Sequence, residues 1–157
     1  MDKELHVADQ ITQFGGEERF VAAPEKLYEL LTNLDAMAAT IPDLVSAEKV
    51  DERTMKCVVR PGFSFLRGTM RLTIALGDAI RPESAAMSVT AQGIGVSMNV
   101  VSQLNISPEG PGSRLDWTAR IQELKGLISA VSPGLIKAAA DQVIRHAWGQ
   151  VRKQLGE

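Results

Sequence analysis

The sequence predicts an α+β fold in which a curved antiparallel sheet of about seven strands wraps around one long C-terminal helix. Two hydrophobic periods predict it. Between residues 54 and 122, five stretches carry apolar side chains at every second position, which is typical of antiparallel strands covered on one face. After residue 132, apolar side chains recur at spacings of three and four, which indicates an amphipathic helix.

The first expected strand, QFGGEERFVAA at residues 13–23, does not alternate cleanly. Two registers stay open for it: Glu17 and Arg19 face inward in one, and Glu18 and Phe20 face inward in the other. In the first register Glu17 and Arg19 would form a polar anchor, because an arginine fork suits a carboxylate or carbonyl oxygen. In the second register these two residues belong to a solvated face.

Two short helices are expected after this strand. Pro24 suits the first turn of a helix over 24–33, where its missing N–H needs no partner, and leucines follow at helical spacing. The second helix, within 34–40, must end near Ile41-Pro42 because the residue before a proline leaves the α region.

The five alternating stretches, 54–60, 69–76, 86–93, 97–106 and 114–122, predict one apolar inner wall. Only Ser102, Cys57 and the indole N–H of Trp117 could make a polar contact from it. General acid–base catalysis needs a titratable group near the substrate, so this wall argues against an enzyme. Four methionines lie on the wall, and methionine adapts to ligands of irregular shape. The same residues could instead fill a solid core.

The last helix is expected at 133–155, with Ser132 as N-cap and Pro133 in the first turn. The segment before it, GLISAVSPGLI at 126–136, begins with Gly126 and carries Leu127, Ile128 and Val131. It is interpreted either as an apolar gate over a cavity or as a buried turn.

Composition and charge exclude several classes of protein. The formal net charge is -2 and no basic cluster is visible, so nucleic acid is not an expected partner. The only cysteine cannot form an internal disulfide and fits a reducing compartment. Residues 1–10 do not resemble a signal peptide, and no apolar run approaches the ~20 residues that span a bilayer. We expect a cytoplasmic protein with a flexible tail at 1–9 and one domain at 10–157, without metal or cofactor.

Three stretches and the order of the elements resemble the START/Bet v 1-like (SRPBCC) helix-grip superfamily, and within it the CoxG family of carbon monoxide dehydrogenase subunits. The stretches are AAPEKLYELLTNLDAMAATIPD at 22–43, RPGFSFLRGTMRL at 60–72 and GSRLDWTARIQELKG at 112–126. The chain departs from the family pattern at Tyr28, where tryptophan is usual, and at Asp43, where glycine is typical. Relatives often continue into a membrane-binding tail, whereas this sequence stops at Glu157, so membrane association is not expected.

The resemblance implies a helix-grip fold with a ligand cavity between the sheet and the long helix. Together with the apolar wall, it leads us to expect a non-enzymatic binding or carrier protein for a quinone, lipid or polyketide-like molecule. The resemblance to the CoxG family further implies subunits of a molybdenum hydroxylase as partners. A polyketide cyclase or dehydratase, and an interaction module with a solid core, remain alternatives. The candidate ligand-binding residues are Met55, Cys57, Phe63, Phe65, Met70, Leu72, Met87, Val89, Met98, Val100, Trp117, Val131, Leu135, Ile136 and Ala139.

Overall fold

The computed structural model describes residues 13–63, 68–126 and 131–157. The strands of this part form one antiparallel sheet of seven strands in the order β1-β7-β6-β5-β4-β3-β2. The predicted tail at 1–9 lies outside the described residues. The strand bounds are β1 Gln13–Phe20, β2 Leu44–Asp51, β3 Thr54–Val59, β4 Met70–Ile80, β5 Ser84–Gly93, β6 Val96–Glu109 and β7 Gly112–Gly126.

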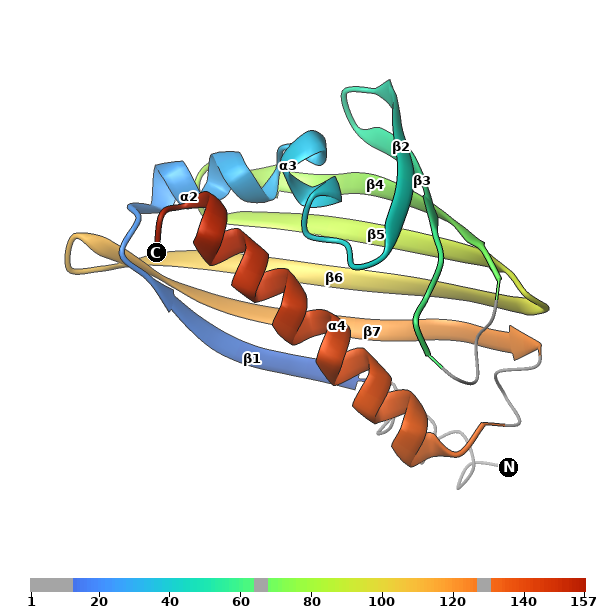
Figure 1. Ribbon diagram of the computed structural model, residues 1–157. Helices are drawn as coiled ribbons and strands as arrows, with labels where there is room; N and C mark the ends of the chain where they lie inside the picture. Colours follow the sequence, from blue (N-terminus) through green and yellow to red (C-terminus); the bar gives the residue numbers. More distant parts are fainter. Residues whose placement is uncertain (1–12, 64–67, 127–130) are drawn as a thin grey trace.

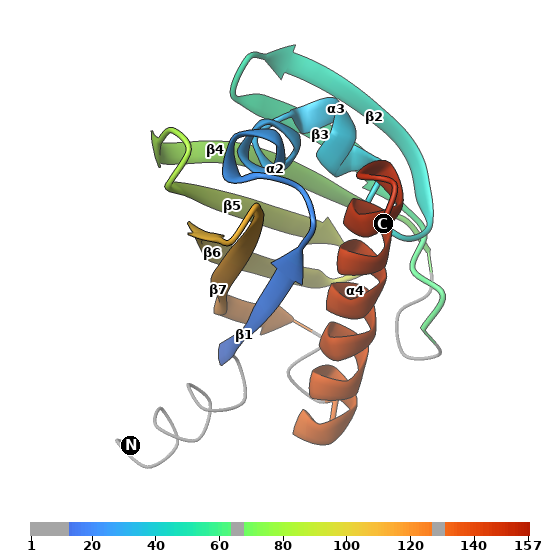
Figure 2. The same ribbon diagram turned by 90° about the vertical axis from the view of Figure 1, so that its left-hand side faces the viewer.

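The long helix α4, Pro133–Gln154, crosses the concave face of the curved sheet obliquely (Figure 1). Two short helices, α2 (Pro24–Leu31) and α3 (Leu34–Ala38), lie beside the C-terminal end of α4 (Figure 2). The predicted α+β architecture is therefore confirmed. None of the helices in the described ranges combines the length and apolarity that a membrane crossing requires.

Local sequence signals explain where the helices begin and end. Pro24 opens α2, and Leu27 and Leu31 of this helix are almost completely buried. The Asn33 side chain caps α3 by accepting a hydrogen bond from the backbone N–H of Ala36 at 3.1 Å. The Ser132 hydroxyl accepts from the backbone N–H of Leu135 at 3.4 Å, so the predicted N-cap of α4 is confirmed.

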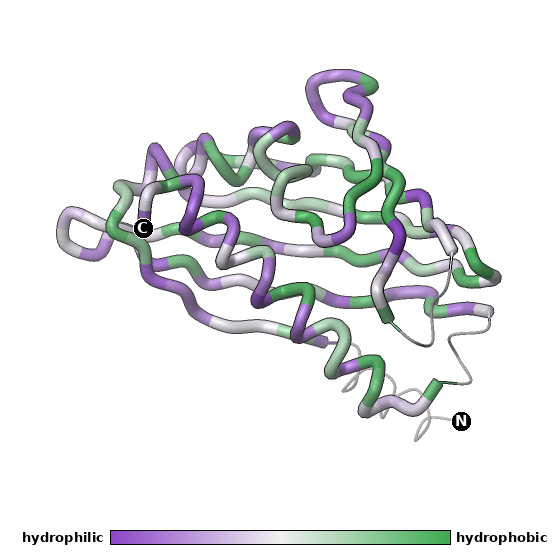
Figure 3. The backbone as a smooth tube through the Cα atoms, viewed as in Figure 1, coloured by the Kyte–Doolittle hydropathy of each residue, from purple (hydrophilic) through white to green (hydrophobic). Residues whose placement is uncertain are grey.

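The pairing with β7 settles the register of β1. Glu18 lies opposite Leu115, and Phe20 is buried, so Glu18 and Phe20 point to the concave side. Glu17 and Arg19 point to the convex side. Hydrophobic and hydrophilic residues alternate along much of the inner strands β4 to β7 (Figure 3). The register in which Glu17 and Arg19 would have faced a cavity is wrong.

One strand, β2, was not among the stretches that the alternation identified. All eight of its residues are exposed, so it has no buried apolar face that a period of two could reveal. It pairs with β3 and forms one edge of the described sheet, while β1 forms the other.

The buried apolar residues of the described chain fall into three clusters, which the partly buried residues Met37, Ile41 and Leu72 connect. The first joins the C-terminal end of α4 to α2, β1 and the neighbouring parts of β5, β6 and β7. The second joins the N-terminal part of α4 to β3, β4, β5 and β6. The third packs α3 against β3, β4 and β5. None of the three clusters includes Val100 or Ser102, which lie in the middle of the concave face.

Candidate functional site

The concave face of the sheet is an apolar wall. Directly paired residues of neighbouring strands point to the same face, so the register places them in continuous rows across the sheet. The inward positions predicted from the alternation of β3 to β7 form these rows. One row contains Met55, Ile74, Val89, Val100 and Ile121, the next contains Leu76, Met87, Ser102, Ala119 and Phe14, and a third contains Ala85, Leu104, Trp117 and Gly16.

Helix α4 packs tightly against this wall near both of its ends. Ile136, near its N-terminus, is 8% exposed and packs with buried residues of β3 to β6. Val151, near its C-terminus, is 1% exposed and packs with residues of β5, β6 and β7. Between them, Ala140 and Ala147 are only partly buried and Val143 is exposed. The middle of the helix is therefore less closely packed than its ends.

The wall under the middle of α4 is accessible although it faces inward. Val100 and Ser102 lie on β6 between Val96, which belongs to the cluster at Ile136, and Leu104, which belongs to the cluster at Val151. Both are partly exposed, as are Ala119 and Ile121 opposite them on β7. None of these four belongs to the three clusters of described residues. An inward side chain that stays accessible must border a space.

A groove of about 780 Å³ lies between β1 and α4, along one side of this space. Phe14 lines the groove and lies in the same row of the sheet as Ala119 and Ser102, so the groove adjoins the end of that row. Its lining residues are Gln13, Phe14, Gly15 and Glu18 of β1, Trp117 of β7, and Lys137, Asp141, Ile144, Arg145, Trp148, Gly149 and Arg152 of α4.

The two tryptophans of the chain meet in this groove. The ring centroids of Trp117 and Trp148 are 5.8 Å apart, and the rings are tilted by 51°. Gly16 permits this arrangement, because a Cβ atom at that position would lie 3.2 Å from the indole nitrogen of Trp117. The Nε1 atoms of both indoles are buried, and neither has a hydrogen-bond partner within the described chain.

An ion pair joins the groove to the end of β1. Arg152 Nη2 lies 3.1 Å from Glu18 Oε1, and Arg152 Nη1 donates a hydrogen bond to the backbone oxygen of Arg19 at 2.7 Å. The Arg152 guanidinium also lies 4.5 Å from the centroid of the Phe20 ring. Through these contacts Arg152 connects the last turns of α4 to β1.

Glu17 and Arg19, the predicted polar anchor, lie outside this space. Glu17 Oε1 pairs with Arg114 Nε at 2.5 Å, and Arg19 Nε pairs with Glu109 Oε2 at 2.8 Å on the convex face. Hydrogen bonding to Glu109 raises the pKa of Arg19 above its ordinary value. Glu18 takes the inward position instead because the register of β1 is shifted by one residue from the one that an anchor required.

The remaining predicted site residues differ in how far they are buried. Phe63 and Val131 pack at the cluster around Ile136, and Ala139 is partly buried on α4. Leu135 is 52% exposed, so it is not part of the buried wall. Its neighbour Ile136 takes the buried position on α4 instead. Phe65, Leu127 and Ile128 lie outside the described residues. Five residues of the groove were not predicted from the sequence as site residues: Phe14, Glu18, Lys137, Arg145 and Trp148.

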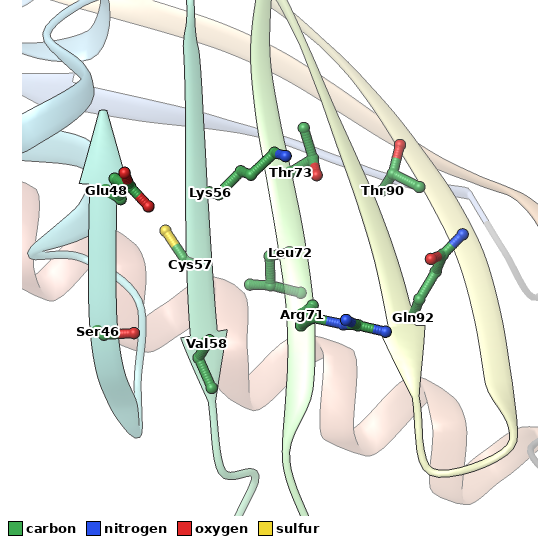
Figure 4. Close-up of a pocket in the computed structure, with 10 residues that line it drawn as sticks. All are labelled: Ser46, Glu48, Lys56, Cys57, Val58, Arg71, Leu72, Thr73, Thr90 and Gln92. Atoms are coloured by element: carbon green, nitrogen blue, oxygen red, sulfur yellow. The ribbon is translucent and has the colours of Figure 1, made fainter. Parts of the chain in front are cut away.

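A second depression, of about 460 Å³, lies on the convex face of the sheet (Figure 4). Its polar side chains come from β2 to β5 and include Lys56 and Arg71. Neither cation forms an ion pair within the described chain. This depression lies on the side of the sheet opposite α4.

The chemistry that the concave side can perform is limited. Burial raises the pKa of the Cys57 thiol, which keeps it protonated and unreactive at neutral pH. Glu18 is held by Arg152. Within the described ranges, no group of three or more histidine, cysteine, aspartate or glutamate side chains is arranged to hold a metal ion. The arrangement is suited to enclosing an apolar molecule.

Solved structures share this fold at low sequence identity. A conserved protein from Geobacillus kaustophilus superimposes with a TM-score of 0.84 at 16% identity, covering 92% of this chain and 95% of its own. A START superfamily protein from Mycobacterium smegmatis has a TM-score of 0.67 at 11% identity, covering 91% and 96%. A Rhodobacter sphaeroides protein has a TM-score of 0.62 at 17% identity, covering 93% of each chain. No curated protein matches the sequence.

The sequence also matches one protein family along nearly its whole length. Residues 16–156 fit the pattern of the carbon monoxide dehydrogenase subunit CoxG. This range contains all the strands except the first residues of β1, and all the helices of the described chain. The family and the START-like fold suggest a ligand-binding or carrier role. The chain belongs to the CoxG family of carbon monoxide dehydrogenase subunits.

Proposed function

We propose that this protein is a non-enzymatic carrier that binds a small hydrophobic molecule between the concave sheet and α4. One observation carries the proposal: α4 is packed at Ile136 and Val151, while the inward residues between these points remain accessible. Burying apolar ligand surface against such a wall is favourable by roughly 25 cal/mol per Å². A quinone, a lipid and a polyketide-like ring all fit this chemistry.

The family supports a finer proposal about the partner. A carrier of hydrophobic electron acceptors would act beside a molybdenum-containing oxidoreductase, of the kind that carbon monoxide dehydrogenase exemplifies. This part rests on family membership and the apolar wall together. It is tested by co-purification of the tagged protein from its native cells, where subunits of a molybdenum hydroxylase are expected.

The geometry favours a carrier over the two alternatives. A cyclase or dehydratase required Glu17 and Arg19 inside the cavity, and both are paired with other charged residues on the convex face. An interaction module with a solid core required the concave residues to be closely packed, and Val100, Ser102 and Ala119 are partly exposed.

The proposal is tested by native mass spectrometry of freshly purified protein, with extraction and identification of any bound molecule. Titration of the emptied protein with quinones and fatty acids gives the affinity. Ala119→Phe places a large side chain in the space under α4 and is expected to lower ligand affinity at least tenfold. Thr118→Phe is the matched control, because Thr118 is exposed on the other face of the same strand.

The expected result is ligand uptake by the wild type and by Thr118→Phe, and little by Ala119→Phe. A protein that is isolated empty and takes up none of these molecules contradicts the carrier proposal. Equal uptake by both phenylalanine variants would contradict the placement of the ligand under α4.

A further inference from the structure

We propose that the ligand is an amphipath whose head is a carboxylate, and that this head binds in the groove between β1 and α4. The inference rests on the proposed function and names the ligand class for the same space. It follows from two indole N–H groups of the groove that have no acceptor within the described chain, from two cations of the groove that have no counter-ion there, and from the position of the groove at the end of a row of the wall.

Two of these donors are the indole N–H groups of Trp117 and Trp148. Buried polar atoms in native proteins almost always have a hydrogen-bond partner, and an unpaired one requires an explanation. Both Nε1 atoms are buried without a partner, and both residues line the groove. Each indole can only donate, so its missing partner must be an acceptor.

The other two donors are cations on α4. Lys137 and Arg145 line the groove, and neither forms an ion pair within residues 13–63, 68–126 and 131–157. Arg145 donates from Nε to the backbone oxygen of Asp141 at 3.4 Å, which leaves its other nitrogens available. Arg152, the third cation of the groove, is already bound by Glu18 and by the backbone of Arg19.

The charges of the groove favour an anion over a neutral head. The groove is lined by three cationic side chains and by two carboxylates, Glu18 and Asp141. Glu18 is engaged by Arg152, and Asp141 lies one helical turn from both Lys137 and Arg145 without pairing with either. One positive charge therefore remains. An ionised carboxylate accepts hydrogen bonds only, through two oxygens, so it can pair with a cation of the groove. To accept from the indole N–H groups as well, it must displace the side chains that bury them.

The groove also gives such a ligand its orientation. Phe14 of the groove continues in the row of Ala119 and Ser102, so an apolar tail can extend from the groove along the accessible part of the wall. The carboxylate stays at the edge, beside exposed Lys137 and Arg145, where water can reach it. This placement buries the tail without removing the charge from water entirely, which would be costly.

The test compares an acid with its neutral ester. Emptied protein is titrated with dodecanoate and with methyl dodecanoate at neutral pH, and binding is measured by calorimetry. Tryptophan fluorescence is recorded in parallel, because the chain contains two tryptophans and both line the groove. We expect the acid to bind at least tenfold more tightly than the ester and to change the tryptophan emission.

Two double variants locate the head. Lys137→Gln/Arg145→Gln removes the free cations of the groove and is expected to abolish the preference for the acid while ester binding persists. Lys56→Gln/Arg71→Gln removes the same charges from the convex depression, where neither cation is paired, and is expected to keep the preference (Figure 4). Both variants change the net charge equally.

The outcomes separate this inference from the function on which it rests. Equal affinity for acid and ester, or tighter binding of the ester, overturns the acidic head and leaves the carrier in place. A preference that survives Lys137→Gln/Arg145→Gln overturns the assignment to this groove. Binding of neither molecule overturns the proposed function itself.

Discussion

Gly16 determines how closely Trp117 lies against β1. The absent side chain leaves room for the indole, whose ring centroid lies 5.8 Å from that of Trp148. The neighbouring Gly15 faces the convex side, so the two adjacent glycines have different environments. The position of the Trp117 indole in the groove therefore depends on the absence of a Cβ atom at residue 16.

Gly16→Ala is expected to destabilise the protein by about 1 kcal/mol, because the new methyl group overpacks an indole that has little room to move. Gly149→Ala is the control: it lies inside α4, a Cβ there meets nothing within 4 Å, and alanine favours a helix by up to about 1 kcal/mol. Urea unfolding measures both changes. Unchanged stability and unchanged tryptophan emission in Gly16→Ala would show that the indole moves aside freely.

The two ends of α4 differ from its middle in how they support the fold. Val151→Ala removes methyl groups from a site that is 1% exposed and is expected to cost about 2 kcal/mol of unfolding free energy. Val143→Ala, at a site that is 36% exposed, is expected to cost about 0.5 kcal/mol or less. The gain in helix propensity is the same for both, so the difference reports packing. Equal costs in chemical denaturation would mean that α4 is packed evenly along its length.

The helices and inner strands could be predicted because each has a local signal. Ser132 and Pro133 mark the start of α4 in the sequence itself, and the alternation of β4 to β7 reflects one buried face. Strand β2 has no buried face, and β1 carries two glycines and apolar residues only near its ends, so neither reveals its register. For β1, the pairing with β7, a contact distant in sequence, decides the register.

The groove could not be predicted for the same reason. It joins residues 13–18 to residues 137–152, which come together only when α4 crosses the sheet beside its edge strand. Trp117 was recognised on the wall, but its contact with Trp148 depends on the angle at which α4 lies. From the sequence, Arg152 in the last turn of the helix is explained by its favourable interaction with the helix dipole. No neighbouring residue in the sequence indicates that Glu18 is its partner.

The whole molecule is stabilised at its ends and left partly open at its centre. One cluster holds the C-terminal end of α4, another holds its N-terminal part, and a third holds α3. The side chain of Glu157 adds a further tie by accepting hydrogen bonds from the backbone N–H groups of Val21 and Ala22 at 2.7 and 3.1 Å. Wall residues that border the open space lose dispersion contacts that a filled core would supply.

An occupant of that space should therefore stabilise the entire fold. A ligand present at 100 times its Kd adds about 2.7 kcal/mol to the free energy of unfolding, and a domain of this size gains about 2–4 °C in Tm per kcal/mol. We expect the Tm of the emptied protein to rise by roughly 5–10 °C on saturation with a bound ligand. Ala119→Phe should show little rise, because its own side chain fills the space. Calorimetric scans of both proteins with and without ligand decide the point, and an equal rise in the two would place the ligand elsewhere on the molecule.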